Sequence, residues 1–285
     1  MKILSIQSWV ADGHVGNAVS LFALQRLGAE VAAIHTVQFS NHPGHGAFTG
    51  RVYPAADTAA LVEGLAAHGT LAGCDGLLTG YIGDTGTGEA ILQAAALLRA
   101  ARQDALWCCD PVMGDDGRLY VQPGLPDFFG RQALPQADLL TPNQFELGLL
   151  AGRKVDTLKQ AGHAAMALRE RMRPGGPRVV LVTSLRTAET PAGTLHMLLA
   201  AGQGAWLLGT EFLPAKFSGA GDVLAALFLY HMLACANPLQ AAERAAGSLA
   251  RVLRRTWQDG APELQIVAAQ DDLLQPAPLR VERQY

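Results

Sequence analysis

The stretch DGLLTGYIGDTGTGEAILQAAALLRAARQDALWCCDP, residues 75–111, contains the unit from which the fold can be built. Two short apolar runs, 75–80 and 105–110, frame a longer segment, 86–103, whose apolar residues recur at helical spacing. Short runs without polar alternation are typical of strands that are buried on both faces. The stretch therefore predicts a strand, a helix and a second strand parallel to the first.

The same alternation continues on both sides of this unit. Further buried strands are expected at 2–7, 29–37, 137–142 and 178–184, and helices near 15–27, 57–68, 143–150 and 156–172. Strands that alternate with helices in this way predict an α/β fold, in which helices cover both faces of a parallel sheet.

The C-terminal third departs from strict alternation. Residues 194–212 form two consecutive apolar runs separated by Gly202 and Gly204, which predicts an antiparallel hairpin added to the sheet. A long helix over 238–258 and a last strand at ELQIVAA, 263–269, are expected after it. Since no Pro/Ser-rich linker or repeat interrupts the chain, we expect residues 1–285 to form one domain.

Composition excludes several classes of protein. Hydrophobic residues make up 49%, charged residues 16%, and the formal net charge is −3 without any basic run, so we expect no nucleic-acid partner. The N-terminal apolar run is broken by Gln7, Ser8 and Asp12, which argues against a signal peptide or membrane span and for the cytoplasm. The cysteines lack a C-x-x-C pair and are expected to be reduced thiols: Cys74, Cys108, Cys109 and Cys235.

Polar side chains follow almost every predicted strand. In open parallel sheets the ligand binds outside the carboxyl ends of the strands, so these residues are predicted to converge on one site. They are Ser8, Asn41, His42, Tyr81, Asp110, Thr141, Asn143, Thr183 and Ser184.

The stretch KFSGAGDVLAALFLY, 216–230, predicts a helix with a weak first turn. Gly219 and Gly221 each cost about 1 kcal/mol relative to Ala within a helix. An ordinary N-terminus capped by Ser218 would leave both glycines unexplained. Bare N–H groups at the positive end of a helix bind anions, so an anion site is the favoured interpretation.

Asp222 lies in the same first turn. The positive end of the helix dipole is expected to favour the ionised carboxylate and lower its pKa. Such a carboxylate could orient an alcohol for phosphoryl transfer, or could pair with the helix dipole without any chemistry. Both interpretations stay open at this point.

Two further motifs carry carboxylates. Asp110 closes a predicted strand and precedes Pro111, so it must face the strand edge, where it would suit Mg²⁺ or act as a turn cap. Asn143 and Glu146 begin a predicted helix, where they fit either a site or an ordinary capping arrangement.

A dinucleotide site is excluded. The glycines around His14 lack the third glycine of the fingerprint, and the second strand ends without an acidic residue, at His35 and Thr36. The histidines show no metal-ligand spacing.

Five motifs in unbroken order nevertheless point to one family: TVQFSNH (36–42), LLTGYIGD (77–84), CDPVMGD (109–115), TPNQFE (141–146) and GAGD (219–222). Together they resemble the pyridoxal kinases of the ribokinase-like superfamily. The resemblance implies a three-layer α-β-α fold with a small β lid or flap. It also implies transfer of the ATP γ-phosphate to the 5'-hydroxymethyl group of pyridoxal, and often of pyridoxine and pyridoxamine, giving pyridoxal 5'-phosphate in the case of pyridoxal. Mg²⁺, frequently K⁺, and a homodimer are implied as well.

The resemblance also implies roles for individual residues. Asp222 matches the catalytic base, and the backbone of Gly219, Ala220 and Gly221 matches the anion hole. The substrate side would comprise Ser8, Val37, Phe39, His42, Pro43 and Tyr81. The nucleotide side would comprise Asp110, Asp115, Thr141, Asn143, Glu146, Thr183 and Ser184, with Tyr120 on a mobile flap and the metal held by Asp110 and, through water, Glu146.

The departures from the family pattern lie on the substrate side. Trp9 stands where the family usually has His, Pro43 where it usually has Thr, and Asp12 where a larger or basic residue is usual. Two alternatives therefore stay open: a kinase for another hydroxymethyl heterocycle such as hydroxymethylpyrimidine, and a vitamer-binding or sensing protein with slow turnover. The TVQFSNH motif and Tyr81 favour pyridoxal.

Overall fold

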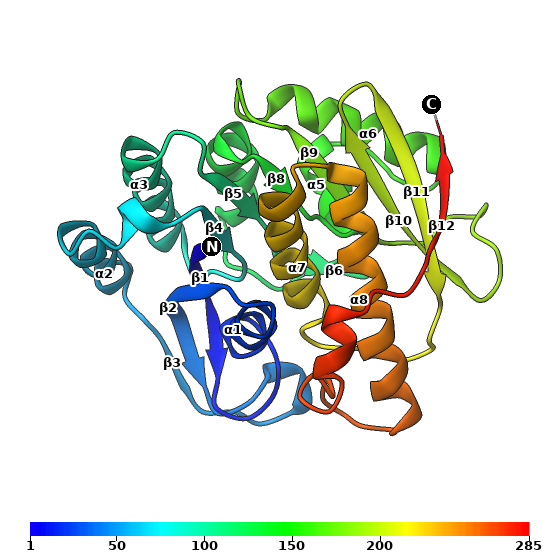
Figure 1. The fold of residues 1–285 in the computed structure, drawn as a ribbon, viewed down its shortest axis with the longest axis horizontal. Helices are drawn as coiled ribbons and strands as arrows, with labels where there is room; N and C mark the ends of the chain where they lie inside the picture. Colours follow the sequence, from blue (N-terminus) through cyan, green and yellow to red (C-terminus); the bar gives the residue numbers. More distant parts are fainter. Residues whose placement is uncertain (285) are drawn as a thin grey trace.

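The computed structural model describes residues 1–284, and within them ten strands form one sheet in the order β12-β11-β10-β9-β8-β5-β4-β1-β2-β3 (Figure 1). The strands are β1 (Lys2–Val10), β2 (Glu30–Phe39), β3 (Gly50–Val52), β4 (Gly76–Thr79), β5 (Leu106–Cys109), β8 (Leu139–Leu140), β9 (Val179–Leu185), β10 (Thr194–Ala201), β11 (Gly204–Glu211) and β12 (Arg280–Arg283). The helices are α1 (Asn17–Arg26), α2 (Ala55–Ala67), α3 (Thr85–Ala101), α4 (Leu125–Phe128), α5 (Gln144–Ala151), α6 (Leu158–Arg171), α7 (Ala220–Cys235) and α8 (Pro238–Gln258).

The centre of the sheet is parallel. Strands β2, β1, β4, β5, β8 and β9 run in one direction, so their carboxyl ends share one edge. The predicted hairpin is present as β10 and β11, which add antiparallel strands beyond β9. The predicted α/β architecture with a mostly parallel sheet is confirmed.

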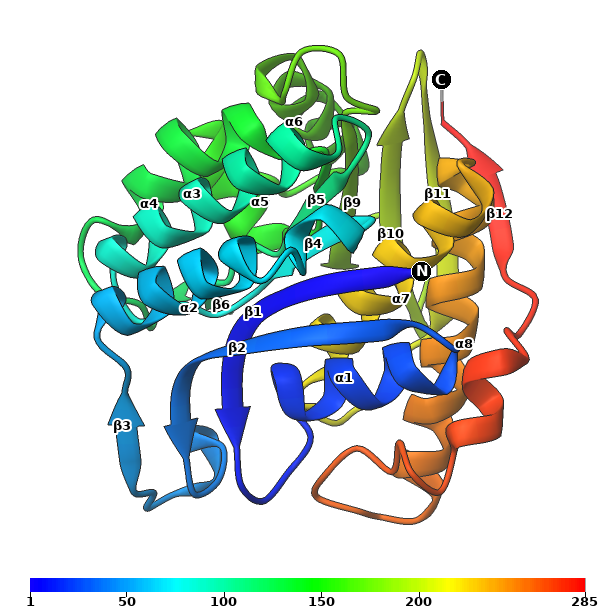
Figure 2. The ribbon, with the colours of Figure 1, turned by 60° about the vertical axis from the view of Figure 1, so that its left-hand side comes forward.

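Alternate side chains of each strand enter two separate cores. Leu77 and Trp107 pack with α2, α3, α5 and α6, whereas their neighbours Leu78 and Cys108 pack with α1, α7 and α8. Figure 2 shows the sheet between these two helical layers. Strands buried on both faces explain why the sequence contains continuous apolar runs instead of alternating ones.

A two-stranded hairpin lies outside the main sheet. It consists of β6 (Gly114–Asp115) and β7 (Arg118–Leu119), joined through Asp116, which has a φ of 49°. This hairpin corresponds to the small β flap that the family resemblance implied.

The strand predicted at 263–269 is wrong. This segment forms turns, and the Ala269 N–H donates to the Gln265 carbonyl at 2.8 Å. Leu264 and Ile266 are buried in the core beside α7 and α8, so the apolar pattern reflects packing onto helices. The last strand is instead the charged segment β12, which pairs with β11 at the edge of the sheet, where charged side chains are common.

All four cysteines are free thiols, as predicted. No helix in residues 1–284 combines the length and the apolar character that crossing a membrane requires.

Asp138 anchors the amino-terminal edge of the sheet, opposite the carboxyl ends of the strands. Its carboxylate is fully buried and accepts hydrogen bonds from Arg99 Nη2 at 2.7 Å, Arg173 Nε at 2.7 Å and the Trp107 N–H at 2.9 Å. Breaking a buried ion pair leaves an uncompensated charge in the interior.

We expect Asp138→Ala to lower the free energy of unfolding by about 3–5 kcal/mol, because both guanidinium groups lose their buried partner. Urea denaturation measures this loss. Asp104→Ala is the matched control, since the Asp104 side chain is 78% exposed in its pair with Arg102 and should change stability by less than about 1 kcal/mol. Equal losses in the two variants would contradict a structural role for the buried carboxylate.

Candidate active site

A cleft of about 1810 Å³ opens at the carboxyl ends of the parallel strands. It runs from β2 across the first turn of α7 to the surface of α8. All but one of the site residues predicted from the sequence line it: Ser8, Val37, Phe39, His42, Pro43, Tyr81, Asp110, Asp115, Tyr120, Thr141, Asn143, Glu146, Thr183, Ser184, Gly219, Ala220, Gly221 and Asp222. The prediction for Asn41 is wrong, because its side chain bonds within its own loop, donating to the Ala47 carbonyl at 3.3 Å. The convergence expected from strand order is therefore present, while the role of each residue stays a prediction.

The first turn of α7 has no side-chain cap. Gly219, and not Ser218, occupies the N-cap position, with a φ of 84° in the left-handed region. An added Cβ on Gly219 would overlap with the His14 carbonyl oxygen. Gly219 is therefore required both by its backbone conformation and by the close approach of another chain segment.

Gly221 has a different environment. A Cβ at this position would meet only Asp110 Oδ2, at 3.9 Å, so the space in front of it is open cleft. Helix geometry leaves the first N–H groups of α7 without intrahelical acceptors. The turn is consequently an open, uncapped helix N-terminus that faces a carboxylate across the cleft, which is the arrangement expected for an anion held with a cation.

Asp222 is partly buried in this turn, and its Oδ2 accepts the Gly16 N–H at 2.8 Å. Burial raises the pKa of Asp222 to about 6, although the Gly16 hydrogen bond acts in the opposite direction. The lowered pKa predicted from the helix dipole is thus wrong, because loss of water around the carboxylate outweighs the favourable dipole.

Two more carboxylates, Asp110 and Glu146, line the cleft with Asp222. Asp110 is 6% exposed and accepts the Thr141 hydroxyl at 2.9 Å. Burial, Glu146 and Asp222 all raise the pKa of Asp110 well above its usual range. In residues 1–284 no Lys or Arg forms an ion pair with any of these three carboxylates, although basic residues such as Arg186 and Lys216 line the cleft.

Glu146 has a structural role as well. Its Oε2 accepts the Asn143 N–H at 2.9 Å and its Oε1 accepts the Met113 N–H at 2.8 Å, while Asn143 Oδ1 accepts the Glu146 N–H. The capping box considered from the sequence is therefore present, and it also holds the base of the β6–β7 flap. Burial raises the pKa of Glu146 to about 7.

The remaining nucleotide-side residues surround this cluster. A parallel bridge joins Asn143 to Thr183, and Ser184 adopts a φ of 50°, a conformation that costs energy for a residue other than glycine. Tyr120 follows the flap and is 57% exposed. At the flap tip, Asp116 pairs with Lys216 at 3.1 Å, an exposed contact that adds little stability.

The substrate side is organised around a bulge in β1. The register between β1 and β2 shifts between Gln7 and Trp9, at Ser8. Gly16, with a φ of 55°, packs so closely on Ser8 that an added Cβ would overlap with the Ser8 hydroxyl. The glycine turn at 13–16, which does not match the dinucleotide fingerprint, thus contacts both Ser8 and Asp222 through Gly16.

Val37, Phe39 and Tyr81 border the cleft next to Ser8, and His42 and Pro43 lie at its rim. The His42 ring Nδ1 accepts the Gly44 N–H at 3.2 Å, and burial lowers the pKa of His42. A neutral His42 therefore carries its proton on Nε2. Pro43 occupies the first position of a 3₁₀ turn, Pro43–His45, where no N–H is needed.

Two of the unusual substrate-side residues do not line the cleft. Trp9 packs on His35, with ring centroids 4.7 Å apart, and neither Trp9 nor Asp12 borders the cavity. The third departure from the family pattern, Pro43, does line the cleft.

Sequence reasoning missed one end of the cleft. Arg186, whose guanidinium lies 4.1 Å from the Phe212 ring centroid, borders the nucleotide side. The far end is formed by α8 and the C-terminal segment. They contribute apolar residues and three basic side chains: Ala246, Leu249, Leu253, Pro278, Leu279, Arg251, Arg254 and Arg255. These residues belong to ordinary amphipathic patterns, so no local signal marked them.

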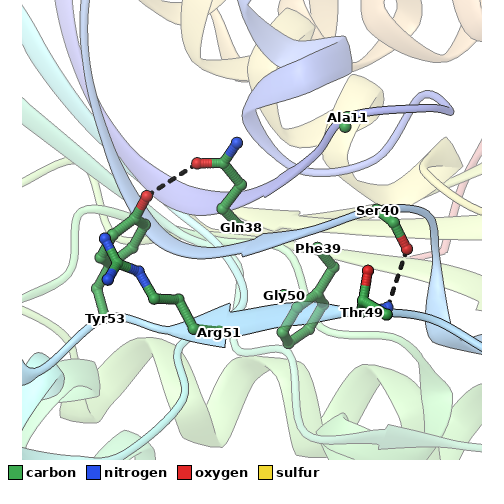
Figure 3. A pocket seen from close by; sticks show the side chains of 8 residues that line it. All are labelled: Ala11, Gln38, Phe39, Ser40, Thr49, Gly50, Arg51 and Tyr53. Carbon is green, nitrogen blue, oxygen red and sulfur yellow. Dashed lines mark hydrogen bonds between the residues drawn. The ribbon is translucent and has the colours of Figure 1, made fainter.

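A second hollow lies on the outer edge of the sheet, between β2 and β3 (Figure 3). Tyr53 donates to Gln38 Oε1 at 2.9 Å, and Ser40 Oγ accepts the Thr49 N–H at 3.0 Å. Arg51 is its one charged residue and lies over the Tyr53 ring. The hollow lacks a cluster of titratable groups, so the cleft is the candidate site.

Strand-end carboxylates that face an uncapped helix N-terminus, on a mostly parallel sheet, define an α/β small-molecule kinase with a ribokinase-like fold. The family model described as phosphomethylpyrimidine kinase matches residues 32–265. The chain is 52% identical to pyridoxal kinase PdxY of Granulibacter bethesdensis over 97% of both chains, and 50% identical to pyridoxal kinase PdxY of Deinococcus radiodurans over 96% of this chain and 93% of the relative. The chain belongs to the pyridoxal kinase family.

Solved structures agree with this assignment. Pyridoxal kinase from Leishmania donovani in complex with ADP and ginkgotoxin superimposes with a TM-score of 0.91 at 32% identity, covering 100% of this chain and 99% of that one. The same enzyme with ADP and pyridoxamine gives the same TM-score, identity and coverage.

The two glycines of the α7 turn allow a matched test. Gly219→Ala should lower the free energy of unfolding by about 1–3 kcal/mol, because the new side chain is strained and meets the His14 carbonyl. Gly221→Ala should keep or raise stability, since Ala favours helix and finds open space, yet it should lower turnover by about tenfold or more by filling the anion site. Urea denaturation and steady-state turnover measure both effects. Similar stability losses in the two variants would contradict the distinction.

Proposed function

We propose that this protein phosphorylates the 5'-hydroxymethyl group of pyridoxal, and also that of pyridoxine and pyridoxamine, at the expense of ATP. The observation that carries the proposal is the meeting of Asp222, the open turn at Gly221 and the strand-end carboxylate Asp110 in one cleft. Full-length identity to proteins named pyridoxal kinase supports the choice of substrate.

Asp222 acts as the base in this proposal. Its Oδ2 is held by the Gly16 N–H, so the carboxylate has a defined orientation. As the 5'-oxygen bonds to the γ-phosphorus, the bond from that phosphorus to the ADP oxygen breaks, and the hydroxyl proton passes to Asp222. A pKa near 6 leaves Asp222 mostly ionised at neutral pH and makes it a stronger base than an ordinary aspartate.

The backbone at Gly219, Ala220 and Gly221 binds the transferring phosphoryl group at the N-terminus of α7, where the Ala220 N–H also donates to the Phe217 carbonyl at 3.2 Å. Thr141, Asn143, Thr183 and Ser184 border the nucleotide, and the apolar end at α8 suits its base. Tyr120 and the flap cover the phosphates and keep water out.

The donor set fits Mg²⁺. Asp110 and Glu146 are buried carboxylates that form no ion pair with a residue in 1–284, and Mg²⁺ prefers one or two carboxylates together with water and phosphate oxygens. Asp110 would hold the ion, with Glu146 reaching it through water because its oxygens already accept backbone N–H groups. When bound, the ion supplies positive charge that neutralises the phosphates.

On the substrate side, Ser8 binds the pyridine ring, and Val37, Phe39 and Tyr81 enclose it. His42 offers its Nε2–H to a polar ring substituent, while Pro43 lacks the hydroxyl that the family resemblance implies at this rim. Because Trp9 lies outside the cleft, the substrate side departs less from the family than the sequence alone indicates.

Three finer proposals rest on the same family likeness. We infer a homodimer, a monovalent cation such as K⁺ and a cytoplasmic location, supported by membership of the pyridoxal kinase family.

A second candidate substrate is hydroxymethylpyrimidine, which the family model described as phosphomethylpyrimidine kinase favours. Parallel turnover assays should give rapid ADP release with pyridoxal and at least about tenfold lower kcat/KM with hydroxymethylpyrimidine. Formation of pyridoxal 5'-phosphate, followed by its absorbance, confirms the product. Preferential turnover of the pyrimidine would overturn the assignment. Binding of pyridoxal with negligible turnover would favour the sensing alternative.

We expect Asp222→Asn to lower kcat by at least about 100-fold, because the positioned base is lost, with little change in the KM for ATP. Asp127→Asn is the control, since Asp127 is 75% exposed in a surface pair with Arg131. Near-wild-type turnover of Asp222→Asn would exclude its role as the base.

A further inference from the structure

Glu263 joins two segments on the substrate side of the cleft, although it does not line the cleft itself. Its Oε1 lies 2.8 Å from His45 Nδ1, and its Oε2 accepts the His14 N–H at 3.1 Å. Its side chain is only 22% exposed. One carboxylate thus holds two segments, the turn after β1 and the loop between β2 and β3. In Figure 1 the loop between β2 and β3 lies beside the loop after α8, which carries Glu263.

The backbone that carries Glu263 is firmly packed. The adjacent Leu264 is 1% exposed and lies close to Gly219 of the anion turn. The Gln265 N–H donates to Thr256 Oγ1 at 2.9 Å and thereby ties the segment to α8. Glu263 therefore projects from a fixed point of the core that also supports the catalytic turn.

The segment at its other end, residues 42–46, has few polar contacts with the rest of the described chain. Residues 42–46 bond otherwise to their immediate neighbours, as in the Gly44 N–H to His42 and the His45 N–H to the His42 carbonyl. Within the described residues, the His45–Glu263 pair is the one hydrogen-bonded or ionic contact between 42–46 and a distant part of the chain.

This contact reaches the cleft through His42. The His42 and His45 rings meet edge to face, with centroids 5.4 Å apart, and His42 and Pro43 line the cleft. At the other end of Glu263, the His14 carbonyl packs on Gly219, and Gly16 holds Asp222. The Glu263 carboxylate therefore contacts both the loop at the substrate rim of the cleft and the turn that holds the proposed base, Asp222.

We propose that Glu263 is a positioning residue for substrate binding, which holds the 42–46 loop, and with it His42, at a fixed place relative to Asp222. The proposal rests on the proposed function, in that the bound molecule is the B6 vitamer. Without Glu263 the loop must be ordered when the vitamer binds, so affinity for the vitamer falls. In residues 1–284 the Glu263 carboxylate bonds only to His45 and His14, so the nucleotide side is expected to keep its affinity.

The first test is kinetic. We expect Glu263→Ala to raise the KM for pyridoxal about tenfold, in line with loss of a charge-assisted hydrogen bond, with kcat and the KM for ATP within about twofold of wild type. Glu263→Gln keeps an acceptor and a donor and should restore most of the affinity. Asp271→Ala is the matched control, because it removes a nearby carboxylate that is 81% exposed and pairs with Arg26.

The second test does not depend on activity. Hydrogen exchange of the amides of residues 41–49 should be faster in Glu263→Ala than in wild type and unchanged in Asp271→Ala. His45→Ala removes the same contact from the partly exposed loop, so it tests the pair even if Glu263→Ala folds poorly. If the two residues act as one tether, the double variant should raise the KM for pyridoxal no more than about twofold beyond Glu263→Ala.

Unchanged exchange in residues 41–49 would overturn the proposal, as would a rise in the KM for ATP equal to that for pyridoxal. A wild-type protein that does not phosphorylate pyridoxal would refute the proposed function instead, and the exchange experiment would still decide whether Glu263 tethers the loop.

Discussion

The contact between the Gly13–Gly16 turn and the first turn of α7 holds the site together. The Gly16 N–H binds the Asp222 carboxylate from a position 206 residues away, and the His14 carbonyl packs directly on Gly219. Both contacts require glycine, because a Cβ at Gly16 or Gly219 would overlap with Ser8 or His14. Through this contact, the start of the sheet and the helix that follows the hairpin form one rigid surface on which the proposed substrate lies between Ser8 and Asp222.

Electrostatics imposes the second constraint. Asp110, Glu146 and Asp222 are gathered in one cleft, and burial raises the pKa of each. Such a cluster is unfavourable by itself, and a polyanionic nucleotide would make it more so. The uncapped helix N-terminus offsets part of this charge, and a divalent cation that arrives with the nucleotide would offset the rest. The arrangement therefore favours the loaded state of the proposed kinase over the empty one.

The two glycines in GAGD illustrate how one motif combines separate requirements. Gly221 faces open cleft, where we propose that a phosphoryl group binds, whereas Gly219 satisfies a left-handed backbone and the approach of His14. The substrate-side departures separate in the same way. Trp9 packs against His35 away from the cleft, while Pro43 begins a 3₁₀ turn at its rim. Residues that look equivalent in a sequence motif thus have different physical causes.

The sequence by itself determined the α/β architecture, the order of most elements and the cleft residues at the strand ends, because runs such as 75–80 and 105–110 reveal strands buried on both faces, and strand ends of a parallel sheet must meet. It did not reveal the end of the cleft formed by α8 and the C-terminal segment. It led to a wrong strand at 263–269, since the apolar residues of that segment pack on helices and local pattern does not identify the packing partner. It also led to a wrong direction for the pKa of Asp222. Only the tertiary structure decided that pKa, the anchoring of His45 by Glu263 and the reason for Gly219, because burial and contacts between distant segments arise when the chain is folded.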